Sequence, residues 1–317
     1  MKEKVLRSFG IELTEINNKV KAYKILIDSL AYIIDTTGIK PSIEGIIELL
    51  DKIGIRINKN VVQDVIPDVM TRIGKISYNV IKLYQYEVSR LLSSEIRKKL
   101  AAYYTGPLGT KIMSCLAERF IEKTWKSGIV IADPFMGSAI TLTEAIRNLG
   151  IHRIKRVWGV EKHPLVCIVA YASLLGATNG LNDIIDVKCG DSFKIIWGGN
   201  VALDKFLKGN NTYSADVILT NPPFTRWEGL DESYREFLKR MIGLMGYSKF
   251  MVRKQVNLQA ISLFLIDTVL NEGGLLVTVL PASTFYTIYG QGVKTLLRER
   301  YHIAAIIQKV TSTFSID

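Results

Sequence analysis

Four polar side chains follow apolar segments of the sequence at nearly equal intervals. They are Asp133, Glu161, Asp191 and Asn221, separated by 28, 30 and 30 residues. One strand–helix–strand unit takes about 30 residues, so parallel strands would bring these groups to one edge of a sheet. Ligands of open α/β sheets bind at that edge. Any one of the acids could instead be only a helix cap or a loop residue, but four in register predict a binding site.

The first of these residues opens a turn that a helix-length segment follows, Asp133-Pro134-Phe135-Met136-Gly137-Ser138-Ala139. Glycine lets a ligand approach the backbone closely, and a helix start offers N–H groups. The turn lacks the pattern of triphosphate loops and the triple-glycine dinucleotide fingerprint. An acid after the second strand can accept both hydroxyls of a ribose, and one after the third can accept an adenine amine. We therefore predict a pocket for an adenosine-containing cofactor without a phosphate chain, formed by Asp133, Pro134, Phe135, Gly137, Glu161 and Asp191.

The fourth strand end reads Asn221-Pro222-Pro223-Phe224. Two prolines stiffen the turn and supply no N–H groups, so its carbonyl groups point outward as acceptors. The Asn221 amide oxygen and the Pro222 carbonyl suit the exocyclic amine of a flat base, on which Phe224 would stack. An ordinary rigid loop is the alternative. We predict these four residues to be catalytic, with Asn221 also lining the cofactor pocket.

The elements that must position these residues alternate between strands and helices. Short, β-branched segments are expected to be strands at Ile129–Ala132, Val157–Val160, Ile185–Val187, Val217–Thr220, Leu275–Leu280 and Ile303–Ile307. Helix-length segments lie between most of them, notably Thr141–Leu149, Leu165–Ala177 and Leu258–Leu270. This alternation predicts an α/β fold, a doubly wound and mostly parallel sheet with helices on both faces.

Residues 1–100 have a different, helical pattern, with apolar residues three and four positions apart. We expect a helical N-terminal domain here and a second domain over residues 101–317. A short helix is predicted at Ile43–Ile53 and a longer one at Tyr78–Ala101. The longer helix would bury Ile81, Tyr84, Val88, Leu91 and Leu92 and would end in the cations Arg97, Lys98 and Lys99, either solvated or in contact with phosphate.

Composition limits the class of protein. The 317 residues are 48% hydrophobic and 22% charged, which excludes a disordered or collagenous chain. The net charge of +11 favours a polyanionic partner, because cations release counterions from phosphates. The three cysteines are far apart, so no disulfide framework and no metal site are predicted. No apolar run is long enough to span a bilayer and no secretory signal is present, so we expect a cytoplasmic protein without a membrane partner.

The segments Asp133–Ala139 and Asn221–Phe224 together resemble the S-adenosylmethionine-dependent amino-methyltransferases, particularly the DNA adenine-N6 enzymes. Tyr103-Tyr104-Thr105-Gly106-Pro107 is similar to the Tyr-Tyr-Thr-Pro element that precedes their first strand and binds the methionine part of the cofactor. This order is that of the gamma-type enzymes, which include type I modification subunits and fused restriction–modification enzymes. The resemblance extends from about residue 80 to the end of the chain, including Asn271–Ser283. It implies a Rossmann-like methyltransferase fold, S-adenosylmethionine as cofactor, and Tyr104 and Thr105 as further cofactor-binding residues.

Two residues depart from the family pattern. Ala139 stands where the family has glycine, and alanine fits there unless its φ is positive. Gly106 separates the threonine and proline of the element before the first strand. Both departures bear on cofactor affinity.

The resemblance implies methyl transfer to the N6 amine of a flipped adenine in DNA, within a restriction–modification system. Phe224 and Trp227 would stack on the base, although local packing is an equal alternative for Trp227. Four cations that follow the catalytic loop would contact the DNA backbone or form a solvated surface: Arg226, Lys249, Arg253 and Lys254.

The sequence also leaves alternative functions open. No Pro-Cys nucleophile occurs, which argues against cytosine-C5 methylation, and His152, His163 and His302 are interpreted as structural. The alternatives are an RNA guanine-N2 methyltransferase and a non-catalytic module that binds DNA or another subunit. Because the sequence stops soon after Ile303–Ile307, target recognition is expected from a separate specificity subunit or from a missing C-terminal domain.

Overall fold

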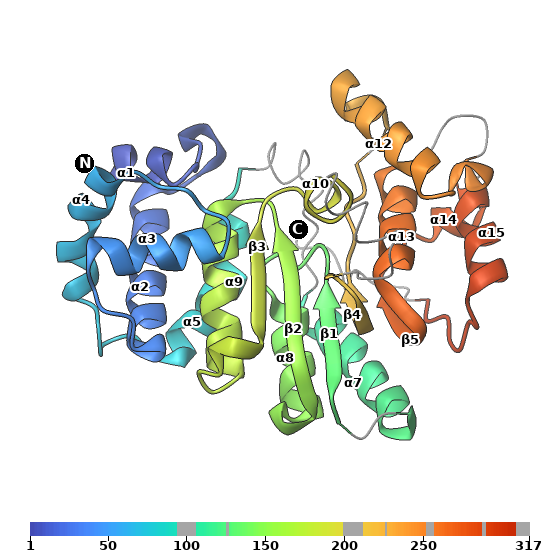
Figure 1. The fold of residues 1–317 in the computed structure, drawn as a ribbon, viewed down its shortest axis with the longest axis horizontal. Helices are drawn as coiled ribbons and strands as arrows, with labels where there is room; N and C mark the ends of the chain where they lie inside the picture. Colours follow the sequence, from blue (N-terminus) through green and yellow to red (C-terminus); the bar gives the residue numbers. More distant parts are fainter. Residues whose placement is uncertain are drawn as a thin grey trace.

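The sheet at the centre of the molecule has five parallel strands in the order β3-β2-β1-β4-β5 (Figure 1). The structure, a computed structural model, describes residues 1–93, 106–124, 127–198, 212–225, 227–251, 257–286 and 290–308. The strands are β1 (Ile129–Asp133), β2 (Ile154–Glu161), β3 (Ile185–Cys189), β4 (Ala215–Thr220) and β5 (Leu270–Thr278). The order reverses between β1 and β4, which makes their carboxyl ends the switch point of the sheet.

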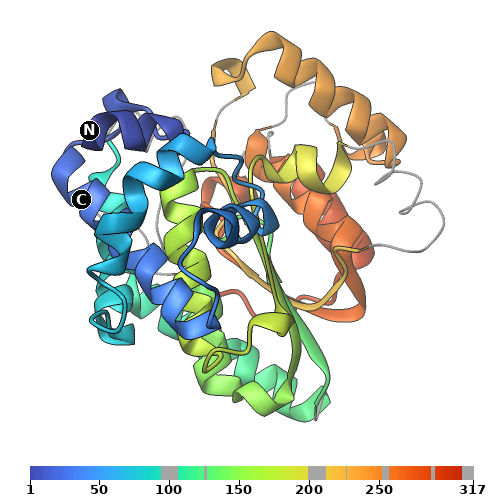
Figure 2. The same ribbon diagram turned by 60° about the vertical axis from the view of Figure 1, so that its left-hand side comes forward.

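Helices cover both faces of the sheet, which confirms the predicted doubly wound α/β fold (Figure 2). Alternate residues of a strand point to opposite faces. On β4, Val217 and Leu219 join one buried cluster and Ile218 joins the other. The first cluster contains side chains of α7 (Pro107–Thr124), α8 (Ile140–Leu149) and α9 (Pro164–Ala177). The second contains side chains of α10 (Ser192–Trp197), α12 (Glu232–Leu244), α13 (Leu258–Val269) and α15 (Gln291–Arg300).

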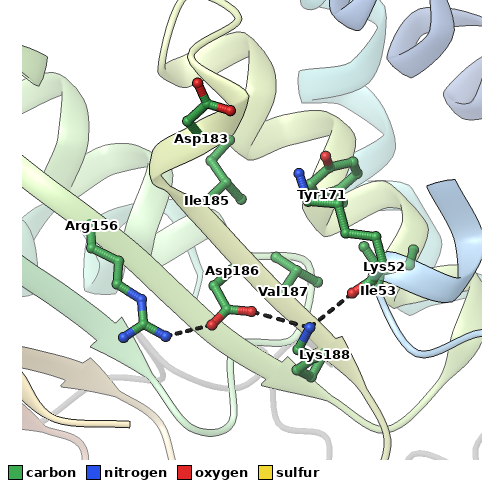
Figure 3. Close-up of a pocket in the computed structure, with 9 residues that line it drawn as sticks. All are labelled: Lys52, Ile53, Arg156, Tyr171, Asp183, Ile185, Asp186, Val187 and Lys188. Carbon is green, nitrogen blue, oxygen red and sulfur yellow. Dashed lines mark hydrogen bonds and ion pairs between the residues drawn. The ribbon is translucent and has the colours of Figure 1, made fainter. Parts of the chain in front are cut away.

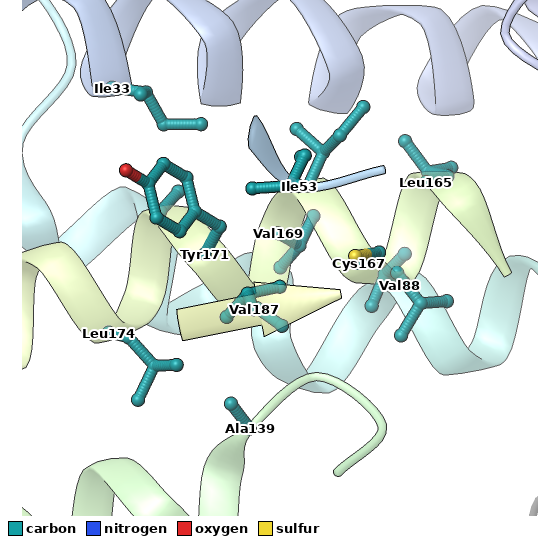
Figure 4. Close-up of a cluster of buried hydrophobic side chains, with 14 of the residues drawn as sticks. Ile33, Ile53, Val88, Ala139, Leu165, Cys167, Val169, Tyr171, Leu174 and Val187 are labelled. Carbon is teal, nitrogen blue, oxygen red and sulfur yellow. The ribbon is translucent and has the colours of Figure 1, made fainter. Parts of the chain in front are cut away.

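The N-terminal helices lie beyond α9 and extend the first cluster without a break (Figure 4). They are α1 (Lys2–Ser8), α2 (Lys19–Thr37), α3 (Ile43–Lys52), α4 (Lys59–Met70) and α5 (Tyr78–Leu91). Helix α9 is buried continuously from Leu165 to Leu175, because α2 and α5 pack on it opposite the sheet. A helix that is apolar on all sides is expected in such a position. The division of the chain near residue 100 lies outside the described residues and stays a prediction.

Local sequence signals explain where several of these helices begin. The side chains of Asn18 and Ser42 accept hydrogen bonds from the Lys21 and Gly45 N–H groups at the starts of α2 and α3. Such caps satisfy N–H groups that have no partner inside the helix. The remaining short elements are η1 (Leu13–Glu15), η2 (Ile151–Arg153), η3 (Asn182–Ile184), η4 (Trp227–Gly229), η5 (Ser248–Phe250) and α14 (Ser283–Tyr286).

The long helix that was expected to reach Ala101 ends at Leu91 instead. Leu92 is extended and forms an antiparallel bridge with Ile16, and the Ser93 N–H donates to the Glu15 carbonyl at 2.7 Å. A tertiary contact with the segment after η1 therefore stops the helix. The five predicted inward-facing side chains of this segment are all buried, while Arg97, Lys98 and Lys99 lie outside the described residues.

The strand expected at Ile303–Ile307 is not formed. Residues 301–308 follow α15 without regular structure, and Ile306 and Ile307 are 67% and 61% exposed. A β-branched run needs a partner strand to complete its hydrogen bonds, and none of the described residues pairs with this one. The fifth strand begins five residues before its predicted start, because Leu270 pairs with Ala215 of β4.

None of the helices in the described ranges combines the length and the apolar composition needed to cross a bilayer.

Candidate functional site

The four predicted strand-end residues lie at one edge of the sheet, on four neighbouring strands. Asp133 and Glu161 are the last residues of β1 and β2, and Asn221 follows β4 directly. Asp191 lies two residues beyond β3. Because β1 pairs with both β2 and β4, the two acids and the asparagine surround the switch point. The sequence spacing therefore corresponds to a spatial cluster.

Asp133 is almost fully buried, with 2% of its surface exposed. Its Oδ1 accepts a hydrogen bond from the Phe135 N–H at 2.9 Å. Burial raises the pKa of this carboxyl group to about 7, and the negative charge of Glu161 adds to the increase. The hydrogen bond from the Phe135 N–H opposes the shift in pKa without cancelling it.

Glu161 is in a similar electrostatic environment on the next strand. Its Oε1 accepts from the His163 N–H at 2.6 Å, and the Lys162 and Gly137 N–H groups also stabilise its charged form. Loss of hydration nevertheless raises the pKa of this carboxyl group to about 7. Two neighbouring acids thus hold protons near neutral pH, and a ligand that donates hydrogen bonds or carries positive charge would favour their ionised forms.

The loop between β1 and α8 passes close to β2. The Met136 N–H donates to the Val160 carbonyl at 3.0 Å, and a Cβ at Gly159 would lie 2.4 Å from the Met136 Sδ. Gly159 therefore permits this approach. The backbone is left-handed at Gly137 (φ 55°) and at Ala139 (φ 60°). Ala139 thus has the positive φ that costs a non-glycine residue roughly 1–2 kcal/mol.

Asp191 caps helix α10. Its Oδ1 accepts from the Phe193 and Lys194 N–H groups at 3.1 and 3.2 Å. The Tyr234 hydroxyl, on α12, donates to Oδ2 at 2.8 Å, and the Lys162 ammonium is 3.4 Å from the same oxygen. Asp191 is therefore a helix cap, which was one of its two interpretations. Its role as an acceptor for an adenine amine stays a prediction.

The Asn221-Pro222-Pro223-Phe224 segment has no regular secondary structure, and it is anchored at both ends. The Val279 N–H donates to the Thr220 carbonyl at 3.2 Å, and the Leu258 N–H donates to the Thr225 carbonyl at 3.1 Å. The Asn221 side-chain oxygen is shielded from solvent, Pro222 is buried, and Pro223 and Phe224 are partly exposed. The segment thus presents one partly exposed aromatic ring beside a protected amide.

Trp227 packs against the second buried cluster, which agrees with local packing as its role. Lys249 forms a surface ion pair with Glu299 at 2.8 Å. Tyr104, Thr105, Arg226, Arg253 and Lys254 lie outside the described residues, so their predicted roles stay predictions.

Sequence reasoning assigned no site role to four residues that contact the predicted site. Gln85 and Ser138 exchange buried hydrogen bonds between α5 and the loop after β1. His163 was interpreted only as structural, and its ring lies 3.7 Å from Glu15 of η1, with burial lowering its pKa to about 4. Tyr234 binds Asp191. No spacing signal identifies these residues, because each depends on an element distant in sequence.

A separate cavity of about 360 Å³ lies on the outer side of β3 (Figure 3). Two of its cations are ion-paired, because Arg156 and Lys188 both contact Asp186. The third, Lys52, donates from its ammonium group to the Asn182 Oδ1 at 2.8 Å. This cavity contains none of the predicted site residues. In the described ranges, no group of three or more His, Cys, Asp or Glu side chains is arranged to hold a metal ion.

Comparison with known proteins gives similarity in structure only. No family model and no curated protein matches the chain. A Listeria monocytogenes protein assigned to the class I S-adenosylmethionine-dependent methyltransferases superposes with a TM-score of 0.52 and 16% identity, covering 88% of this chain and 79% of that chain. The type IIG restriction endonuclease BpuSI gives a TM-score of 0.53 and 12% identity, covering 86% of this chain and 33% of that chain. The chain thus has the Rossmann-like methyltransferase fold that its motifs predicted, and it spans about a third of the length of BpuSI.

A third structure, the methyltransferase subunit of a type I restriction-modification system from Streptococcus thermophilus, has a TM-score of 0.47 and 19% identity. That match covers 76% of this chain and 48% of that subunit.

Proposed function

We propose that this protein transfers a methyl group from S-adenosylmethionine to the N6 amine of a flipped adenine in DNA. The observation that carries the proposal is the placement of the Asn221–Phe224 segment beside two acids, the buried Asp133 and the partly exposed Glu161. The segment follows β4, and the acids Asp133 and Glu161 end β1 and β2, so all lie at the switch point of the sheet. A cofactor and a base bound at this edge would be neighbours.

The acids suit the adenosine part of the cofactor. Both carboxyl groups have a pKa near 7 because of burial, and hydroxyl donors or a nearby positive charge would stabilise their ionised forms. When bound, S-adenosylmethionine supplies a methyl group on a positively charged sulfur. The proposed ligands of the ribose hydroxyls are the Glu161 oxygens, and the loop with Gly137 would follow the cofactor closely.

The Asn221–Phe224 segment suits a poorly nucleophilic amine. The nitrogen lone pair of adenine N6 is delocalised into the ring, and hydrogen bonds to the Asn221 oxygen and the Pro222 carbonyl would direct it toward the methyl group. Orientation of this kind supplies up to roughly 7–11 kcal/mol of a reaction barrier. Flipping the base out of the duplex costs a few kcal/mol. Stacking on Phe224, worth about 1–3 kcal/mol per base, would offset part of that cost.

The proposed setting is a restriction–modification system, as for BpuSI, which is described as a restriction endonuclease. DNA is the proposed partner, and target recognition by a separate specificity subunit or by a further domain is proposed with it. The net charge of +11 supports a nucleic-acid substrate.

Transfer of a tritiated methyl group tests the proposal. The purified protein is incubated with labelled S-adenosylmethionine and with unmethylated DNA or transfer RNA, and the product nucleoside is identified by chromatography. We expect N6-methyladenine in DNA, and a loss of at least about a hundredfold in rate for Asn221→Ala, because the amine loses its acceptor.

Asn271→Ala serves as the matched control. Asn271 is an exposed asparagine of β5 that bonds Asp216 at 2.8 Å, away from the strand-end site. It should retain the wild-type rate. Labelled guanine in RNA with unlabelled DNA would instead identify an RNA guanine-N2 methyltransferase, and no binding of S-adenosylmethionine would leave a non-catalytic module.

A further inference from the structure

A buried glutamine side chain of helix α5 donates a hydrogen bond to the loop that follows β1. Gln85 lies in the middle of α5 and is 3% exposed. Its Nε2 donates to the Ser138 carbonyl at 2.9 Å and to the Thr143 Oγ1 at 3.3 Å. In return, the Ser138 hydroxyl donates to the Gln85 carbonyl at 2.8 Å. Two buried polar side chains, 53 residues apart, thus each donate to the backbone carbonyl of the other residue, which satisfies their hydrogen-bonding groups.

The loop needs such support because its backbone conformation is unfavourable. Ala139 has a φ of 60°, which a residue with a Cβ adopts only when its surroundings impose it. It follows Ser138 directly, so the two hydrogen bonds between Gln85 and Ser138 act next to the strained residue. Ala139 is the N-cap residue of α8, and because its side chain has no polar atom, no side-chain hydrogen bond caps the start of this helix.

The same N-terminal region touches the next two strand ends. The His163 ring, two residues beyond Glu161, lies 3.7 Å from the Glu15 carboxylate. The Cys189 N–H, at the end of β3, donates to the Ile53 carbonyl at 2.7 Å. Helices of residues 1–93 therefore contact the ends of β2 and β3 and the loop after β1, which together form the cofactor half of the proposed site.

We propose that Gln85 is a positioning residue: through Ser138 it holds the loop after β1 in the shape that binds the cofactor. This inference rests on the proposed function, since it identifies the ligand of that loop as S-adenosylmethionine. Gln85 contacts no substrate. Its contribution is to the affinity for the cofactor, and the rate at saturating cofactor is set by other residues.

The test compares wild type with Gln85→Met and Ser138→Ala. Methionine keeps the length of glutamine without its hydrogen bonds. Calorimetry with S-adenosylhomocysteine should show binding about tenfold weaker for Gln85→Met, because the loop loses a buried hydrogen-bond partner. The turnover number at saturating S-adenosylmethionine should stay within about twofold of wild type. The double variant should lose more affinity than either single variant, because each substitution removes a different one of the two hydrogen bonds between Gln85 and Ser138.

Tyr247→Phe is the control for a purely structural effect. The Tyr247 hydroxyl donates to Asp267 at 2.5 Å within the second buried cluster. Its loss should lower the melting temperature and leave the dissociation constant unchanged. If Gln85→Met behaves in the same way, the positioning role is wrong.

Hydrogen exchange supplies a readout without any ligand. Amides of residues 137–140 should exchange faster in Gln85→Met than in wild type, with no change in β4. Unchanged exchange at residues 137–140 would overturn the inference about Gln85, whether or not the cofactor binds wild type. Failure of the cofactor to bind wild type would by itself refute only the proposed function. If Gln85→Met does not fold, Ser138→Ala is the milder variant, and we expect it to show weaker cofactor binding and faster exchange at residues 137–140. Wild-type affinity and wild-type exchange in Ser138→Ala would refute the positioning role of Gln85.

Discussion

The carboxyl groups of Asp133 and Glu161 lower the stability of the ligand-free protein at neutral and higher pH. Asp133 is buried and Glu161 is partly buried, and loss of hydration raises the pKa of each carboxyl group to about 7. A carboxyl group whose pKa is raised in the folded state makes folding less favourable as the pH rises from its ordinary pKa to the raised one. Binding sites keep such groups because a complementary ligand restores the lost interactions.

Asp133→Asn should therefore stabilise the ligand-free protein at pH 8 and weaken cofactor binding. Above pH 7 wild type holds a buried charge that the variant lacks, so we expect a melting temperature a few degrees higher for the variant. Near pH 4 the folded Asp133 is neutral in wild type, and the difference should vanish. Thermal unfolding at several pH values checks the first part, and calorimetry with S-adenosylhomocysteine, at least about tenfold weaker, checks the second.

Asp216→Asn is the matched control. The Asp216 side chain accepts from the Val130 N–H at 2.9 Å near the opposite end of the strands. It should show neither the gain in melting temperature at pH 8 nor the loss of binding. A lower melting temperature for Asp133→Asn at pH 8 would contradict the electrostatic explanation.

At the level of elements, helix α12 contacts the cofactor half of the proposed site. Tyr234 reaches from it to the Asp191 cap of α10, and the Lys162 and Lys194 ammonium groups lie 5.9 and 5.8 Å from the centre of its ring. Burial and the Asp191 carboxylate raise the pKa of the Tyr234 hydroxyl, so it remains a donor. If Asp191 accepts an adenine amine of the cofactor, that amine competes with Tyr234.

Tyr234→Phe should consequently bind S-adenosylhomocysteine about three- to tenfold more tightly than wild type, since one competing hydrogen bond is worth about 1 kcal/mol. Calorimetry measures the change. Inosine analogues of the ligand, which lack the amine, should not distinguish the two proteins. Equal affinity of wild type and variant for the amine-bearing ligand would argue that Asp191 acts only as the cap of α10.

At the scale of the whole molecule, the first buried cluster joins the N-terminal helices to the sheet. It extends from Val5 of α1 through α9 to Leu219 of β4. Since no polar boundary divides this cluster, we expect residues 1–93 and the sheet to unfold together. Calorimetry and denaturant titration should show one transition with coincident probes. Two separated transitions would instead support the division near residue 100 that the sequence pattern predicts.

DNA binding by this protein alone should be weak and strongly dependent on salt. The net charge of +11 provides cations that can contact phosphates. The more phosphates these cations neutralise, the more steeply the affinity for DNA falls as the salt concentration rises. Fluorescence anisotropy with a labelled duplex between 50 and 200 mM salt should show a loss of at least about a hundredfold. Tight binding to one sequence in moderate salt would show that recognition resides in these 317 residues.

The regular part of the fold could be predicted because its signals are local. Apolar β-branched runs identified β1 to β4, and the 28- to 30-residue spacing placed Asp133, Glu161 and Asn221 at one edge. Parallel strands joined by right-handed crossovers leave few other arrangements for such a pattern. The errors fall where a distant partner decides the outcome, as at Leu92, which pairs with Ile16, and at Ile303, which pairs with no strand in the part of the chain that the structure describes.

The sequence by itself determined the type and order of the strands and which polar residues end them, because side-chain alternation and turn chemistry act between neighbours in the chain. Only the tertiary structure decided the positive φ of Ala139, the raised pKa values of the two acids, and the contacts of Gln85 and Tyr234. The pKa values depend on burial, and the contacts of Gln85 and Tyr234 join residues that are 53 and 43 positions apart; no local pattern encodes either.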